Sequence, residues 1–329
     1  MVDTNATVDR SLPLWGETRW HCCWSPDAGV GIYIHTGRFR KDVDMWWAHV
    51  AAYLPDGQVA VDRLWCRNTS AAGVNAENLD LTITPTGWRS TFDGVGELTS
   101  TAGLSRSVRG SGAPSVALRW EVTAQEVAPV WDLYSAVDHE QDFASDIHIQ
   151  QATTTSGTLW VDGRSFPLQG VGFKDHSSGA RSFAAWHGHR FMIAVMPGWV
   201  IHAVTIFRSN GTAAEPLGVV MSDGRSTPVE QFDLPALADT EGMPCDQEMI
   251  VTGREGPIRL HTKVIHSFPI TITEDNDNYN GIDWDIPSDP MVMVEGIVQL
   301  TAPDGPVGFG FLERSARQST LPMPGGGGR

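Results

Sequence analysis

Short runs that alternate apolar and polar residues recur along the chain, and they restrict its fold more than any other feature. Leu79–Thr84 and residues 117–122 show this period of two, which places alternate side chains on opposite faces of a β-strand. Turn signals such as Asp56-Gly57, Asp93-Gly94 and Asp162-Gly163 stand between the runs, and such pairs tolerate the positive φ of tight hairpins. The pattern predicts an all-β chain of antiparallel strands rather than βαβ units.

The length predicts two domains. A chain of 329 residues suits two units of about 150 residues each. Each half contains several predicted hairpins, and the turn at Asp162-Gly163 offers a break between them. We therefore expect one antiparallel barrel over residues 1–160, a second over residues 161–317 and a flexible tail over 318–329. Helices are expected to be few, with residues 42–52 (DVDMWWAHVAA) as one candidate.

The charge excludes several classes of partner. The net charge is −16, and the 23 lysine and arginine residues are dispersed, so the chain lacks the basic cluster that nucleic acid or an anionic membrane requires. There is no apolar run of about 18 residues and no signal-peptide pattern at the start, which predicts a cytoplasmic protein without a membrane span. The four cysteines contain no CxxC pair and are expected to be reduced thiols.

Tryptophan is unusually frequent, with 13 residues. Each indole buries much area and offers a π face and one N–H donor. The surplus has two interpretations that the sequence leaves open. One is a wide apolar pocket for a ligand, and the other is a core that is rich in tryptophan.

The segment GVGFKDHSSGAR, residues 170–181, has the highest density of reactive groups. Asp175 and His176 supply an acid and an imidazole, Ser177 and Ser178 supply hydroxyls, and Arg181 supplies a guanidinium. Polar groups between apolar strands are costly to bury unless each is paired, so the segment is either a working site or a polar corner that ties strands together. On a strand, Asp175 and His176 point to opposite faces, and only one of them can face a given cavity.

Three further clusters are candidates for substrate contacts. Asp138 and His139 follow an apolar strand, with a solvated turn as the alternative. Trp186 and His187 begin a strand that continues to His189, and Glu313 lies on an apolar strand where a partner such as an arginine would hold it. His187 and His189 share a face as metal ligands do, but no carboxylate follows in the adjoining run. We therefore predict no metal and no cofactor.

The segment 170–181 resembles the motif GxGxRDHSWGxR of lipocalin-like bacterial proteins related to carotenoid 1,2-hydratases and the AttH family. Asp175, His176, Ser177, Gly179 and Arg181 match the motif, whereas Lys174 stands where arginine is usual and Ser178 where tryptophan is usual. Two other features also fit. One is the opening, with a Trp-rich strand, a helix-like segment and then a Pro-Asp-Gly turn (Trp46-Trp47 to Gly57), and the other is the closing strand that ends in Glu313. The resemblance therefore covers roughly residues 15–315. It implies two lipocalin-like barrels and a ligand cavity between or within them.

Together these features predict a cofactor-independent lyase of the hydratase or dehydratase type, or an isomerase. The resemblance implies a hydrophobic, terpenoid-like or polycyclic substrate. Asp175 would be the acid, His176 its partner and Arg181 a third catalytic group. Tryptophan faces would stabilise a cationic intermediate. The alternative is a lipocalin-like binding protein without chemistry. The sequence leaves open the substrate, the direction of reaction and whether the chain forms a homodimer.

Overall fold

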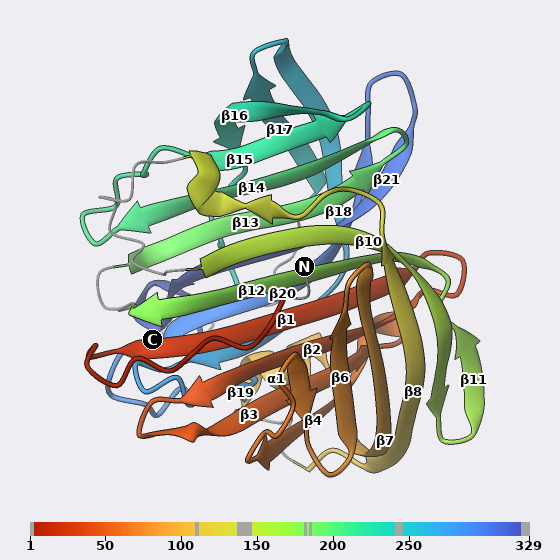
Figure 1. Ribbon diagram of the computed structural model, residues 1–329, viewed down its shortest axis with the longest axis vertical. Coiled ribbons are helices and arrows are strands. Elements are labelled where there is room, and N and C mark those ends of the chain that lie inside the picture. Colours follow the sequence, from red (N-terminus) through yellow and green to blue (C-terminus); the bar gives the residue numbers. More distant parts are fainter. Residues whose placement is uncertain are drawn as a thin grey trace. The chain divides into compact units, whose positions relative to one another are not determined.

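The computed structural model describes residues 3–108, 112–136, 147–180, 183, 186–240 and 246–323 (Figure 1). Their contacts divide into two compact units. The first comprises residues 1–100, 109–181 and 275–280, and the second comprises residues 101–108, 182–274 and 281–329. Among the described residues, none of the helices has the length and apolar character needed to cross a membrane.

The first unit is an antiparallel barrel. Eight strands close into a ring in the order β10-β12-β1-β2-β3-β4-β7-β8 and back to β10. The strands and short helices of this unit are β1 (Trp15–Ser25), β2 (Val30–Phe39), β3 (Asp42–Tyr53), η1 (Pro55–Gly57), β4 (Gln58–Cys66), β5 (Gly73–Asn75), β6 (Leu79–Thr84), β7 (Gly87–Ser100), β8 (Ser115–Glu126), β9 (Trp131–Asp132), η3 (Leu133–Ala136), β10 (Ile147–Val161), β11 (Arg164–Pro167), β12 (Gly170–Ala180) and β19 (Tyr279–Asn280).

The second unit is also a closed antiparallel barrel, with the strand order β18-β17-β16-β15-β14-β13-β21-β20 and back to β18. Its elements are α1 (Thr101–Arg106), β13 (Trp186–Met196), β14 (Trp199–Arg208), β15 (Leu217–Ser222), β16 (Arg225–Asp233), β17 (Asp246–Gly253), β18 (Gly256–Ile272), β20 (Met291–Thr301), β21 (Val307–Arg317) and η5 (Gln318–Thr320). The prediction of an all-β chain with two lipocalin-like barrels and few helices is confirmed.

Alternation along the strands builds the core of the first barrel. One face of β8 is buried and the other is exposed, residue by residue, which is the pattern of a sheet with one solvated side. Its buried residues join one cluster with residues from β1, β2, β3, β7 and β10, and two tryptophans, Trp88 and Trp120, are fully buried there. For these two residues the core interpretation of the tryptophan surplus holds. We call the face that carries this cluster the inward face.

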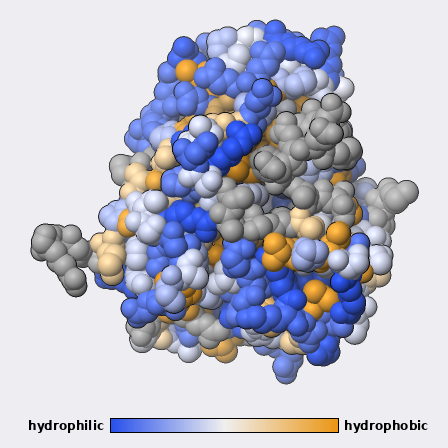
Figure 2. Space-filling view, turned by 90° about the vertical axis from the view of Figure 1, so that its left-hand side faces the viewer, coloured by the Kyte–Doolittle hydropathy of each residue, from blue (hydrophilic) through white to orange (hydrophobic). Residues whose placement is uncertain are grey.

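The main core cluster of the second barrel is aliphatic apart from three methionines and Phe232. It includes Met192, Ala194, Leu260 and Val298, and a smaller cluster forms around Ile282 and Val292 with others. At the surface, hydrophilic residues predominate on the face shown in Figure 2, with small separate hydrophobic patches. Large exposed apolar side chains such as Leu14 and Val95 are scattered along the sequence. Single exposed apolar residues of this kind are normal for protein surfaces.

The helix that we predicted over residues 42–52 is wrong, because this segment is strand β3. From Trp46 onward both faces of the strand are buried. A strand that is buried on both faces is apolar throughout, so it lacks the alternation that distinguishes strand from helix. The Asp93-Gly94 turn is also wrong, since both residues lie inside β7.

The boundary between the units differs from the predicted break after residue 160. Asp162-Gly163 does form a turn, with positive φ at both residues, but it joins β10 to β11 within the first unit. Strand β12 then pairs with β1 and β10. The segment 170–180 therefore lies in the first unit and not in the second, because strand pairing over long sequence separations outweighs the local turn signal.

Candidate functional site

Strand β12 distributes the reactive residues of segment 170–180 over the two faces of the first barrel. Cys23 of β1 belongs to the core cluster, so the period of two directs Arg19 inward as well. His176 lies directly opposite Arg19, whereas Asp175 lies opposite Trp20. Directly opposed residues share a face. His176 therefore points inward and Asp175 outward, as expected for consecutive residues of a strand.

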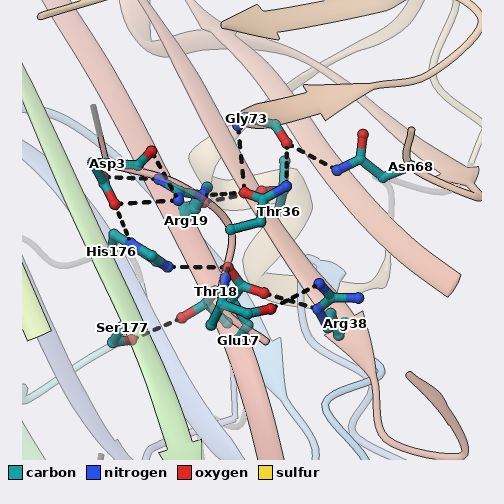
Figure 3. Close-up of polar contacts among 12 residues, drawn as sticks. Asp3, Glu17, Thr18, Arg19, Thr36, Arg38, Asn68, Gly73, His176 and Ser177 are labelled. Atoms are coloured by element: carbon teal, nitrogen blue, oxygen red, sulfur yellow. Dashed lines mark hydrogen bonds and ion pairs between the residues drawn. The ribbon is translucent and has the colours of Figure 1, made fainter. Parts of the chain in front are cut away.

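Inside the barrel, His176 is held between two carboxylates (Figure 3). Its Nδ1 lies 2.7 Å from Asp3 Oδ1 and its Nε2 lies 3.0 Å from Glu17 Oε1. An ionised carboxylate only accepts hydrogen bonds, so both ring nitrogens donate and the ring is an imidazolium in this arrangement. The imidazole is 1% exposed and Glu17 is fully buried.

Two arginines complete this charged cluster. Arg19 donates from Nη1 to Asp3 Oδ2 at 2.9 Å, and Arg38 donates from Nε to Glu17 Oε2 at 2.8 Å (Figure 3). The Arg38 guanidinium also lies 4.6 Å from the ring centroid of Trp46, where the π face is attractive to a cation. Each buried charge thus has a partner of opposite sign, which is the condition for tolerating charges in a barrel interior.

The cluster anchors the segment that precedes β1. Besides Asp3, the side chain of Asn5 accepts from Arg19 Nε at 2.8 Å and donates to the carbonyl of Gly73 at 2.8 Å. The backbone N–H of Ala6 donates to Glu17 Oε1 at 2.8 Å. Residues 3–6 are therefore fastened to the inward face of β1 by side chains that no local sequence pattern links together.

The electrostatics of the cluster favour ionised carboxyls. Burial opposes ionisation of Asp3, but the hydrogen bond from His176 and the charge of Arg19 outweigh it and hold the pKa of Asp3 below its ordinary value. Burial likewise opposes ionisation of Glu17, and the hydrogen bonds from His176 and Arg38 lower its pKa nonetheless. Because both ring nitrogens of His176 are committed, the geometry gives His176 a structural role that ties β12 to β1 and to Asp3. The sequence offered a tying role of this kind as an alternative for Asp175 and Arg181.

A second polar layer lies beside this cluster on the inward face. His21 is cross-strand to Lys174, and its ring meets that of Trp88 edge-on at 5.3 Å. Burial, together with the charges of Arg19 and Lys174, holds the pKa of His21 well below 6.5, so its ring is neutral. Burial also lowers the pKa of Lys174, whose ammonium lies 3.9 Å from Asp3.

The outward face of β12 presents a different pair. Asp175 Oδ2 lies 2.8 Å from Nε2 of His148 on β10, and both side chains keep partial exposure, 16% for Asp175 and 23% for His148. The ring of Tyr134 lies 6.3 Å from that of His148. The carboxylate that we predicted as an acid thus has an imidazole partner, but the partner is His148 rather than His176.

Aromatic and hydroxyl groups surround this pair. Phe173, two residues before Asp175 on the same face, stacks on Trp20 with centroids 6.5 Å apart and planes 10° apart. Ser177 Oγ lies 3.0 Å from the hydroxyl of Thr18. Ser178 is buried on the inward face, opposite Glu17. We call Asp175, His148, Trp20, Phe173 and Ser177 the outward site.

Three of the predicted contact residues belong to the second unit. Trp186 and His187 are half-buried at the start of β13. Glu313 of β21 is hydrogen-bonded to His189 Nε2. Asp138, His139 and Arg181 lie outside the described residues. Within the described ranges, no group of three or more His, Cys, Asp or Glu side chains is placed to hold a metal ion.

The described cysteines, Cys22, Cys23 and Cys66, are thiols that form no disulfide with one another. Burial raises the pKa of Cys23 to about 12 and that of Cys66 to about 11. A thiol with a raised pKa is a poor nucleophile at neutral pH, because the thiolate is the reactive form. Neither Cys23 nor Cys66 is therefore a candidate for nucleophilic chemistry.

Comparisons with known proteins agree with the fold. A family model described as a domain of unknown function, DUF7064, matches residues 3–318, and the chain belongs to this family. None of the curated proteins compared with the chain matches it. Among solved structures, the AttH-like protein NE1406 from Nitrosomonas europaea is similar, with a TM-score of 0.61, 15% identity and 92% of each chain covered.

CghA in a complex with Sch210972 is also similar, with a TM-score of 0.55, 11% identity, and 92% of this chain and 89% of that chain covered. Kievitone hydratase from Nectria haematococca has a TM-score of 0.47 and 10% identity, with 92% of this chain and 89% of that chain covered. At these identities the likeness concerns the fold alone. The resemblance to the lipocalin-like AttH and carotenoid hydratase proteins is confirmed at that level.

Proposed function

We propose that this member of the DUF7064 family is a lyase or isomerase that moves a proton on a hydrophobic small molecule at the outward site. The observation that carries the proposal is the Asp175–His148 pair, 2.8 Å apart and still partly exposed, next to the stacked rings of Trp20 and Phe173. A carboxylate and an imidazole in contact hold one proton between them. Such a pair can donate a proton to a substrate and take one back within the same turnover.

The surroundings of the pair favour an apolar substrate. Trp20 is 5% exposed and Phe173 is fully buried, so the groups next to Asp175 on β1 and β12 are aromatic and dry. Protonation of an alkene or loss of a tertiary hydroxyl creates a carbocation, which an aromatic face stabilises by about 0.5–2 kcal/mol. The hydroxyls of Ser177 and Thr18 supply hydrogen bonds that can orient a substrate oxygen or a water. CghA, with a similar fold, has been crystallised with Sch210972, which supports ligand binding by this fold.

The experiment exposes the purified protein to a panel of terpenoid and polycyclic alkenes and alcohols, with mass spectrometry for products and tryptophan fluorescence for binding. The proposal expects turnover of a panel member that falls by about 100-fold or more in Asp175→Asn and in His148→Gln. Asp80→Asn is the matched control, because Asp80 lies on β6 of the same unit and accepts hydrogen bonds from Asn75 and Thr82 instead.

Two outcomes oppose the proposal. Turnover that is unchanged in Asp175→Asn, with the fold retained, overturns the assignment of the proton-transfer group. Tight binding of a panel member without product formation, by a protein whose affinity is unaffected by Asp175→Asn, supports the alternative of a lipocalin-like binding protein.

A further inference from the structure

In the second unit, three reactive side chains on two neighbouring strands form a hydrogen-bonded row. Strand β21 places Glu313 and Ser315 on one face, because they are two residues apart. Strand β13 runs antiparallel beside it, with Arg190 opposite Arg314, which brings His189 next to both residues. All three belong to the second unit, whereas the residues of the outward site belong to the first.

Local backbone irregularity positions the histidine. The pairing of β13 with β14 shifts between Trp186 and Gly188, which marks a β-bulge just before His189. A Cβ atom on Gly188 would lie 2.3 Å from the backbone oxygen of Ser315, so only glycine permits this approach of the strands. Bulges next to functional sites commonly re-aim a side chain.

The hydrogen bonds of this row share one direction, from Ser315 through His189 to Glu313. His189 Nε2 is hydrogen-bonded to Glu313 Oε1, and His189 Nδ1 lies 2.5 Å from Ser315 Oγ. An ionised carboxylate only accepts, so Nε2 carries a proton, and in the neutral ring Nδ1 keeps a lone pair. The hydroxyl of Ser315 therefore donates to Nδ1. The backbone N–H of His189 donates to the same oxygen at 2.9 Å and fixes its position.

The three side chains of this row are largely buried but keep some exposure to solvent. Ser315 is 6% exposed and His189 is 5% exposed, while the side chain of Glu313 keeps 17%. The ring of Trp186 packs edge-on against His189 at 5.8 Å, and Phe183 packs edge-on against Trp186 at 5.2 Å. These aromatic neighbours keep the local dielectric constant low, which strengthens the hydrogen bonds between the three side chains.

We propose that Ser315 is a nucleophile, with His189 as its general base and Glu313 as the positioning residue for His189, and that this site hydrolyses small carboxylic esters. Catalytic triads are defined by a nucleophile that is hydrogen-bonded to a base, with the base hydrogen-bonded to a carboxylate, irrespective of the fold or the order of the residues in the sequence. The aromatic neighbours Trp186 and Phe183 favour apolar or aryl esters. This activity goes beyond the proposed proton transfer and uses residues of the other unit.

The reaction balances without a cofactor. Ser315 Oγ attacks the ester carbonyl carbon while its proton passes to His189 Nδ1. The ester C–O bond breaks, and the departing alkoxide takes that proton and leaves as the alcohol. Water then attacks the acyl-serine and gives a proton to Nδ1. Release of the carboxylic acid returns that proton to Ser315 Oγ.

The test is covalent labelling of the full chain with diisopropyl fluorophosphate, which phosphorylates an activated serine with release of fluoride. The expected result is one adduct on the wild-type protein, mapped by peptide mass spectrometry to Ser315. Ser315→Ala should remove the adduct, and His189→Gln should slow labelling by about 100-fold or more. Ser319→Ala is the matched control, because Ser319 is exposed and bonded to Asp289, and it should label like wild type.

Mapping on the wild-type protein decides the matter even if a variant fails to fold. Absence of an adduct on Ser315, or an adduct only on another residue, overturns the proposal, and so does labelling that His189→Gln leaves unchanged. Hydrolysis of p-nitrophenyl acetate gives a second readout. There Glu313→Gln should lower kcat with little change in KM, since Glu313 orients the base and does not touch the ester.

Discussion

Glu17 offers the strongest single test of the charged cluster inside the first barrel. Its carboxylate is fully buried and accepts from His176 Nε2 at 3.0 Å, from Arg38 Nε at 2.8 Å and from the backbone of Ala6 at 2.8 Å. Glu17→Leu removes the acceptor for all three donors and leaves two cations in the interior. Breaking a buried pair from one side costs about 3–5 kcal/mol, so we expect a loss of that size in the free energy of unfolding.

Urea denaturation at pH 7 followed by tryptophan fluorescence measures this loss. The signal reports mainly the first unit, because all of the 13 tryptophans except Trp186, Trp199 and Trp284 lie there. Glu17→Gln keeps an acceptor oxygen and should cost about 1–3 kcal/mol. Glu121→Gln removes an exposed partner of Arg119 and should cost less than about 1 kcal/mol. A loss below about 1 kcal/mol in Glu17→Leu would refute the account of a coupled interior cluster.

Three other predictions follow from the first barrel. Below pH 6.5 the His21 ring gains a proton in the unfolded chain but stays neutral in the folded protein, because burial lowers its pKa. The free energy of unfolding should therefore fall as the pH drops below 6.5, by at most about 1.4 kcal/mol per pH unit. Urea titrations of His21→Leu should lack this slope. Gly37→Ala places a Cβ 2.4 Å from the ring of Trp47 and should cost about 1–3 kcal/mol, whereas Gly57→Ala meets no atom within 4 Å and acts only through its positive φ. Asp3→Asn weakens the bonds to Arg19 and His176 and should cost about 1–3 kcal/mol, and equal urea midpoints for Asp3→Asn and wild type would contradict the anchoring of residues 3–6.

The sequence predicts the fold class and many strands because alternation and turn residues are local signals. Residues 79–84 form a strand with the predicted bounds, and the Asp162-Gly163 turn has positive φ at both residues. Strand β3 was not predicted, because it is buried on both faces and its sequence shows no alternation. The boundary after residue 160 differed because β12 pairs with β1, about 150 residues earlier in the chain, and no local pattern encodes that pairing.

In the candidate site too, local features could be predicted from the sequence, whereas contacts between distant strands could not. The sequence singles out Asp175 and His176 as chemically dense and places them on opposite faces, since a strand dictates this. It does not reveal that His148 is the partner of Asp175, or that Asp3 and Glu17 enclose His176. These contacts depend on the register between strands that are distant in sequence. For Asp3 they also depend on a segment that precedes the first strand and lacks secondary structure.

The most direct test of the proposed proton transfer is deuterium incorporation from D2O into a panel substrate, followed by mass spectrometry for wild type, Asp175→Asn, His148→Gln and Asp80→Asn. We expect incorporation by wild type and Asp80→Asn, and a loss of about 100-fold or more in the two outward-site variants with unchanged thermal stability. Equal incorporation by wild type and Asp175→Asn would contradict the proposed proton transfer.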